Sequence, residues 1–66
     1  MMVPLKLRQA RQRRSLTQGE LADLAGVAKQ TIHRAEAGIG APRPSVLRKI
    51  AAALDVEPSD LMTEER

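Results

Sequence analysis

Five polar side chains between residues 29 and 34 are of types that can recognise a nucleic acid. They are Lys29, Gln30, Thr31, His33 and Arg34. Glutamine can pair with adenine through two hydrogen bonds, and lysine or arginine can bind the acceptors of guanine. Threonine can hydrogen-bond a phosphate or contact a thymine methyl. No acidic residue stands among the five, so nothing in the set repels a phosphate backbone. The set predicts a surface that reads base edges in a DNA groove.

The five side chains share an outer face if the small and apolar residues of the same segment point inward. Those inner positions are Ala22, Gly26, Val27, Ile32 and Ala35. Together they predict two helices that cross steeply at a short turn. Ala22 lets the helices approach, Gly26 allows the positive φ of the turn, and Ile32 anchors the second helix. A polar helix face that is merely solvated is the alternative interpretation.

Local signals set the bounds of the first helix of this pair. Thr17 followed three residues later by Glu20 has the spacing of a capping box, so the helix is expected to begin there. Leu21, Leu24 and Ala25 are expected to form its inward stripe, because they recur at helical spacing.

The second helix of the pair is expected to begin at Ala28 or Lys29 and to run to about Ala37, with Gly38 ending it. Ala28 is a poor N-cap, since its side chain offers no oxygen to the first N–H groups of the helix. Residues 38–44 contain two glycines and two prolines and are therefore expected to form a loop.

Three further helices complete the expected architecture, which is an all-α, compact five-helix bundle. The first runs over residues 5–14 and is opened by Pro4. The fourth begins at Pro44 or Ser45, and its inward face is formed by Leu47, Ile50, Ala51 and Leu54. A short fifth helix begins at Pro58. It carries Leu61 and Met62, which either close the core or form part of a twofold interface. Residues 63–66 are expected to be frayed.

Composition supports a helical interpretation. The 66 residues contain no Cys, Phe, Tyr or Trp, so a core must come from aliphatic residues and alanine. Alanine is the best helix former, whereas sheets favour β-branched and aromatic residues. The length predicts one domain over residues 1–66, with a core at about residues 5–62.

Charge is distributed unevenly along the chain. Residues 1–50 carry ten Lys or Arg against three acids, whereas residues 51–66 carry five acids against one arginine. One part of the molecule is therefore predicted to offer a positive surface to a polyanion. A solvated helix face is the alternative interpretation of the charge.

Several function classes are disfavoured. His33 is the only histidine, and without cysteine or clustered acids it makes no metal site. No constellation of a nucleophile and a base is visible, so we expect neither an enzyme nor a cofactor. The N-terminal residues lack an apolar signal core, and the first half has no run long enough to span a bilayer. We therefore expect a cytoplasmic protein without a membrane partner.

Many residues in order carry a resemblance to a known family. The matching segments are Leu16-Thr17-Gln18, Glu20-Leu21-Ala22, Leu24-Ala25-Gly26-Val27, Thr31-Ile32, Arg34, Glu36, Gly38, Pro42, Lys49-Ile50-Ala51 and Leu54. Over residues 5–62 the chain resembles the lambda repressor and Cro-type helix-turn-helix family, often called the XRE family. Ala28, in place of a serine-like cap, and Ala35, in place of a larger aliphatic residue, depart from the family pattern.

The resemblance implies a role for individual residues. The third helix would enter the major groove of double-stranded DNA. Base-reading positions would be Lys29, Gln30, His33 and Arg34. Positions at the DNA backbone would be Gln18, Thr31, Gly40, Arg43 and Arg11. Arg11 and Glu36 would form a salt bridge between the first and third helices, which would make both of them structural residues as well.

Two functions from different classes follow from these observations. The first is sequence-specific DNA binding by a small transcriptional regulator, a homodimer on a two-part operator. The alternative is a protein-partner module with the same fold, such as an antitoxin or a transcription adaptor. A dimer is expected because a monomer of this size neutralises few phosphates.

Overall fold

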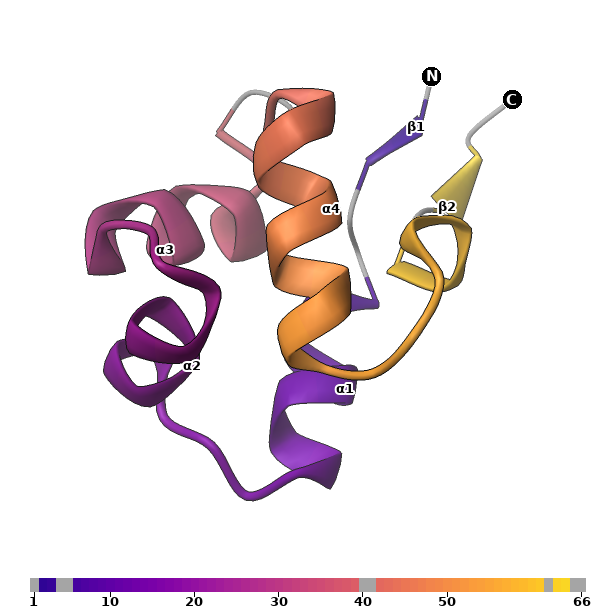
Figure 1. Cartoon of the computed structure of the whole chain (residues 1–66). Coiled ribbons are helices and arrows are strands. Elements are labelled where there is room, and N and C mark those ends of the chain that lie inside the picture. The colour runs from indigo at the N-terminus through magenta and orange to yellow at the C-terminus, as the bar shows by residue number, and fades with distance from the viewer. Residues whose placement is uncertain (1, 4–5, 40–41, 62, 65–66) are drawn as a thin grey trace.

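The structure, a computed structural model, describes residues 2–3, 6–39, 42–61 and 63–64. Over these residues, four α-helices and one 3-10 helix follow one another along the chain (Figure 1). The α-helices are α1 (Leu7–Arg13), α2 (Gln18–Ala25), α3 (Lys29–Ala37) and α4 (Pro44–Ala53). The 3-10 helix η1 spans Pro58–Leu61.

The expected fifth helix is the main difference within the helical part. It is a single 3-10 turn, in which the backbone N–H of Asp60 bonds the carbonyl of Glu57 at 2.9 Å. The carboxylate of Asp60 in turn accepts the N–H of Glu57 at 3.1 Å. This reciprocal pair closes the turn after four residues, so the five-helix bundle is corrected to four helices and a 3-10 turn. Helix α1 is also shorter than expected, because it begins at Leu7 and ends at Arg13.

The first and last described segments pair in a small antiparallel ladder. Strand β1 (Met2–Val3) pairs with β2 (Thr63–Glu64), with Met2 opposite Glu64 and Val3 opposite Thr63. Figure 1 shows these strands beside each other, on the far side of α4 from α3. Two of the residues expected to be frayed are therefore paired. Expectations for Pro4, Leu5, Gly40 and Met62 lie outside the described residues.

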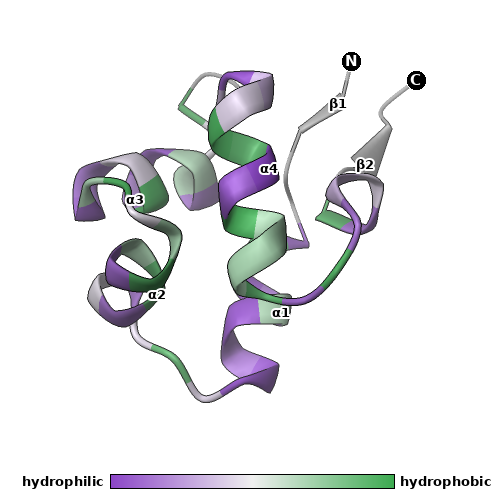
Figure 2. Cartoon of the chain, in the orientation of Figure 1, coloured by the Kyte–Doolittle hydropathy of each residue, from purple (hydrophilic) through white to green (hydrophobic). Residues whose placement is uncertain are grey.

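Six large aliphatic side chains fill the core, one each from α1, α2, α3 and η1 and two from α4 and its C-cap. These side chains are fully buried: Leu7, Leu21, Ile32, Ile50, Leu54 and Leu61. Figure 2 shows apolar residues interspersed among polar ones along α2, α3 and α4, so that each of these helices has a side to bury. Burying one such side chain contributes about 1.5–3 kcal/mol, and six of them hold the helices together.

Leu24 does not join this core, although it was expected on the inward stripe of α2. Its exposed fraction is 62%, whereas Leu21, Ala22 and Ala25 are buried. At 3.6 residues per turn, Leu24 lies about 160° around the helix from Ala22. The buried stripe is centred between Leu21 and Ala22, which leaves Leu24 on the opposite flank.

In the described part of the chain, no helix combines the length and the apolar character needed to cross a membrane.

Candidate DNA interface

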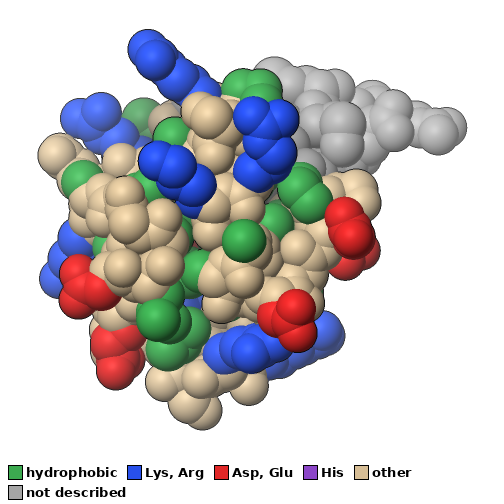
Figure 3. Space-filling view, viewed as in Figure 1, with side chains coloured by type: hydrophobic (Ala, Val, Ile, Leu, Met, Phe, Trp, Pro, Cys, Tyr) green, Lys and Arg blue, Asp and Glu red, His purple; other side chains and the backbone are tan. Residues whose placement is uncertain are grey.

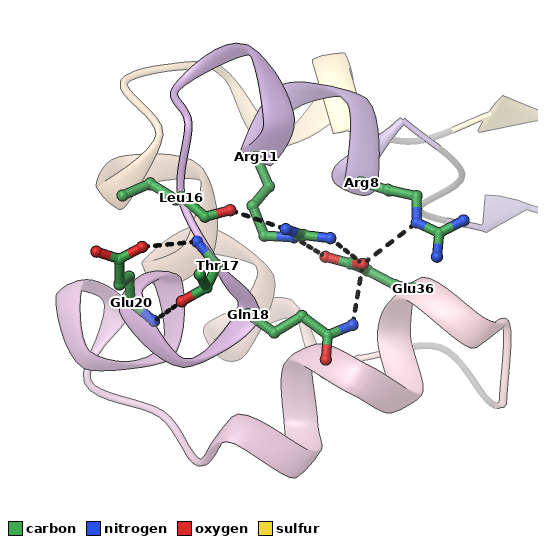
Figure 4. Close-up of polar contacts among 7 residues, drawn as sticks. All are labelled: Arg8, Arg11, Leu16, Thr17, Gln18, Glu20 and Glu36. Atoms are coloured by element: carbon green, nitrogen blue, oxygen red, sulfur yellow. Dashed lines mark hydrogen bonds and ion pairs between the residues drawn. The ribbon is translucent and has the colours of Figure 1, made fainter.

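Helix α2 begins and ends as the sequence predicts. The hydroxyl of Thr17 accepts the N–H of Glu20 at 3.0 Å, and the Glu20 carboxylate accepts the N–H of Thr17 at 2.9 Å. This capping box, visible in Figure 4, fixes the start of α2. Gly26 ends the helix with a φ of 71°, in the left-handed region that glycine adopts at least cost. Val27 is half-buried and packs against the core.

Helix α3 divides into a buried and an exposed face. Ile32 and Ala35 are buried, and they hold the helix against the rest of the domain. The exposed residues include Lys29, Gln30, His33 and Arg34, while Thr31 is half-buried. The structure therefore presents the polar face that the sequence predicts. Ala28 is the N-cap and makes no side-chain bond, as expected.

Basic side chains extend the interface beyond α3. Figure 3 shows several Lys and Arg side chains at the top of this view, where α4 begins, and others at the bottom, where acidic side chains lie beside them. Arg43 is the exposed N-cap of α4, and Pro44 follows at the first helical position. An electropositive region thus lies next to the exposed residues of α3.

A groove of about 290 Å³ connects α3 with the start of α4. Its polar lining comes from Thr31, Arg34 and Arg43, three residues predicted to contact DNA. Its apolar lining comes from Ala35, Ile39, Pro42 and Val46. Ile39 was not among the residues predicted for the interface, and its exposed fraction is 65%. This residue directly follows Gly38, the left-handed end of α3, and its N–H bonds the Arg34 carbonyl at 3.0 Å. An apolar residue at this position commonly packs back against its own helix, so no signal in the sequence indicated its exposure.

A buried carboxylate ties α1, α2 and α3 together. Arg11 Nε lies 2.6 Å from Glu36 Oε2, and Arg11 Nη2 lies 2.9 Å from Glu36 Oε1. A third bond runs from Arg11 Nη1 to the Leu16 carbonyl at 2.8 Å. The ion pair that the family resemblance implied is therefore present, in the bidentate geometry that favours arginine.

Gln18 also bonds the Glu36 carboxylate, a contact that its position in the sequence did not indicate. We call Arg8, Arg11, Gln18 and Glu36 the Glu36 cluster. Gln18 Nε2 donates to Glu36 Oε1 at 3.1 Å (Figure 4). Arg8, which was not predicted to lie at the interface, places its Nε 3.9 Å from the same oxygen. A signal for Arg8 was present, because residues three apart share a helix face and Arg8 precedes Arg11 by three.

The charges in the cluster shift each other's titration. Burial raises the pKa of Glu36, but hydrogen bonds from Arg11 and Gln18, with the charges of Arg11 and Arg8, outweigh it. The pKa of Glu36 is consequently below its usual value. The hydrogen bond to Glu36 raises the pKa of Arg11, and burial opposes this. Both groups are ionised at neutral pH.

The described residues hold no group of three or more His, Cys, Asp or Glu side chains that could bind a metal ion. Gly40, predicted to donate its main-chain N–H to the DNA backbone, lies outside the described residues.

Comparison with known proteins agrees with this geometry. A helix-turn-helix family model matches residues 7–61. The chain is 40% identical over 58 residues to the uncharacterized HTH-type transcriptional regulator RghRB of Bacillus subtilis, covering 86% of this chain. It spans 42% of the length of that relative. It also superposes on the N-terminal DNA-binding domain of the master biofilm-regulator SinR of Bacillus subtilis, with a TM-score of 0.82 and 31% identity. That superposition covers 96% of this chain and 93% of the SinR chain. The chain belongs to the helix-turn-helix family of the lambda repressor and Cro type, whose members are DNA-binding transcriptional regulators and not enzymes.

Proposed function

We propose that this domain binds double-stranded DNA sequence-specifically, with α3 in the major groove, and acts in a small transcriptional regulator. The observation that carries the proposal is the division of α3 into two faces. Ile32 and Ala35 anchor one face in the core, while the other exposes polar side chains without an acidic residue among the base-reading positions. A rigidly held helix with such a face has the shape and the chemistry that major-groove recognition requires.

Base recognition is assigned to the outer face of α3. Gln30 has the two-sided amide that suits adenine, and Lys29 and Arg34 have donors that suit guanine. His33 is exposed one turn after Lys29 and Gln30, where it would read a base further along the groove. These roles determine which sequence is bound.

Backbone binding is assigned to residues around that face. Thr31 and Arg43 line the groove beside Arg34, so one DNA strand that follows the groove would meet all three. Gln18 begins α2 and is assigned to a phosphate next to α3. The three hydrogen bonds of Arg11 go to Glu36 and Leu16, so its role is to hold α1 against α3.

We further propose that two copies bind a two-part operator. Each domain neutralises few phosphates, and affinity for DNA grows with the number of phosphates contacted. Two domains on half-sites about one helical turn apart would double that number and would read a palindrome.

The experiment that tests the proposal is a selection of bound duplexes from a random pool, repeated at two salt concentrations. A two-part palindrome enriched at both concentrations would support a dimeric, sequence-specific regulator. Binding without an enriched motif would contradict base recognition by α3. Absence of binding to any duplex at physiological salt, together with a stoichiometric protein partner captured without DNA, would favour the protein-partner module instead.

A further inference from the structure

We propose that Arg8 and Gln18 jointly hold one phosphate of the DNA backbone, and that the buried carboxylate of Glu36 positions them. This inference rests on the proposed DNA binding and assigns a function to Arg8. It also makes Glu36 a positioning residue for DNA contact in addition to its structural ion pair.

The geometry brings the two donors to one point. Gln18 Nε2 lies 3.1 Å from Glu36 Oε1, and Arg8 Nε lies 3.9 Å from the same oxygen. Gln18 belongs to α2 and Arg8 to α1, and Figure 4 shows the two side chains converging on Glu36 from these separate helices. The two nitrogens are therefore at most about 7 Å apart (3.1 Å plus 3.9 Å), a span that two oxygens of one phosphate group can bridge with hydrogen bonds of ordinary length.

The chemistry of Glu36 fixes the orientation of the Gln18 amide. An ionised carboxylate only accepts hydrogen bonds, so the amide nitrogen of Gln18, and not its oxygen, must face Glu36. The amide has two N–H groups and the bond to Glu36 uses one. The second is left for an acceptor outside the cluster, and Gln18 is only half-buried. Glu36 therefore holds Gln18 as a donor.

Arg8 occupies the exposed edge of the cluster. The exposed fraction of its side chain is 68%, against 12% for Arg11 and 4% for Glu36. The 3.9 Å separation from Glu36 is longer than a hydrogen bond, so the five N–H donors of Arg8 stay available. Arg11 already neutralises Glu36 at close range, so the charge of Arg8 gives these residues a net positive charge.

A phosphate group fits this arrangement because it has negative charge and several acceptor oxygens. Arginine binds phosphate through parallel N–H donors, and a neighbouring amide N–H adds a further bond. The DNA backbone is the source we assign, since Gln18 begins the helix that packs directly against α3.

The test compares the salt dependence of duplex binding for Arg8→Gln and for a matched control, Arg14→Gln. Arg14 lies on the same stretch of chain, but its Nη2 is 3.7 Å from Asp55 Oδ2, directed toward the end of α4. Losing one phosphate contact should flatten the slope of log affinity against log salt by about 0.9. We expect that change for Arg8→Gln and a wild-type slope for Arg14→Gln. Equal slopes for the two variants would overturn the proposal.

A double-variant cycle tests whether Arg8 and Gln18 share one phosphate. If they do, Arg8→Gln combined with Gln18→Ala should reduce affinity by less than the product of the two single reductions. A reduction equal to that product would show two independent contacts and overturn the shared site. Thermal unfolding of each variant verifies that the domain is folded at the temperature of the binding assay.

The variant Glu36→Gln tests whether Glu36 affects DNA binding by orienting Gln18 or only through its negative charge. Removing a negative charge near DNA should by itself strengthen binding, whereas loss of the fixed donor orientation of Gln18 should weaken it. We expect weaker binding by folded Glu36→Gln, and stronger binding would overturn the positioning role.

Two controls test whether Arg8 holds a phosphate group, and distinguish failure of this site from failure of DNA binding as a whole. Because inorganic phosphate competes for the same donors, replacing chloride by it at equal ionic strength should weaken duplex binding by the wild type more than duplex binding by Arg8→Gln. Equal weakening of the two proteins would show that Arg8 holds no phosphate group and would overturn the site. If the wild type binds no duplex, the proposed function itself fails; if it binds and the Arg8 and Gln18 results are negative, this inference alone fails.

Discussion

Truncating Glu36 to alanine removes an acceptor on which two other helices depend. The change deletes the bonds of 2.6 Å and 2.9 Å from Arg11 and the bond of 3.1 Å from Gln18. Arg11 keeps only its bond to the Leu16 carbonyl, with a side chain that is 12% exposed. Removing one partner of a buried ion pair costs about 3–5 kcal/mol, because the other charge is left without compensation, and the partial exposure of Arg11 places this pair at the lower end of that range.

That loss is large for a chain of this length. With 66 residues, the free energy of unfolding is expected to be about 3–10 kcal/mol. A loss of 1 kcal/mol lowers the melting temperature of so small a domain by about 4–8 °C. Glu36→Ala is therefore expected to lower the melting temperature by at least about 12 °C.

The assay is urea and thermal unfolding followed by far-ultraviolet circular dichroism. The chain has no aromatic residue, so intrinsic fluorescence offers no signal, whereas the helices do. The control is Asp23→Ala, an acid on the exposed side of α2, which should change the free energy of unfolding by no more than about 0.5 kcal/mol. Adding Arg11→Met to Glu36→Ala should restore part of the loss, because no unpaired buried charge is left.

Two results would refute this reasoning. Equal effects of Glu36→Ala and Asp23→Ala would show that the ion pair contributes nothing beyond a surface acid. A double variant that is destabilised by the full sum of the two single changes would show that Arg11 and Glu36 do not interact in solution.

Four further predictions concern pH, specificity, DNA backbone binding and helix capping. Because the pKa of Glu36 is lowered by folding, its stabilisation is present above the unfolded value of about 4.3 and lost as pH falls through the folded value. The difference in unfolding free energy between wild type and Glu36→Gln should therefore shrink in acid, and a constant difference would contradict the assignment. Gln30→Ala should cost about 1–3 kcal/mol on the selected site and relax the choice of one base, measured by repeating the selection. Equal loss on all sequences would argue against base reading. Arg43→Ala should weaken binding to all duplexes alike and flatten the salt slope by about one unit, and an unchanged slope would remove Arg43 from the backbone contacts. Ala28→Ser should raise the free energy of unfolding by about 1 kcal/mol, because serine supplies the cap bond that α3 lacks; no gain in urea unfolding would count against it.

Features set by neighbouring residues could be predicted from the sequence. The capping box of Thr17 and Glu20 depends on two residues three positions apart, and the structure has both of its bonds. The left-handed end of α2 at Gly26 is equally local. The polar face of α3 followed from these bounds, because they determine which side chains remain outside once Ile32 is buried.

Features that depend on distant residues could not be predicted in this way. Arg11 and Glu36 are 25 positions apart, and only the family resemblance linked them. The bond between Gln18 and Glu36 spans 18 positions and depends on how α2 and α3 cross. The pairing of β1 with β2 involves two residues in each strand, too few for an alternating pattern to show. For Leu24, spacing alone could not decide which flank of a narrow buried stripe would be covered.

The pairing of Met2 with Glu64 has a consequence for the connectivity of the domain. Because β1 and β2 lie side by side, this domain could be joined by a short linker between them and opened elsewhere, provided that the new ends fall in an exposed segment. Ser15, exposed between α1 and α2 with a φ of 55°, is such a place. In that circular permutant α1 would become the last helix of the chain, so its docking through Arg11 would no longer be assisted by the short turn into α2. The stability of the folded permutant would measure how much the ion pair between Arg11 and Glu36 contributes to the docking of α1 without that turn.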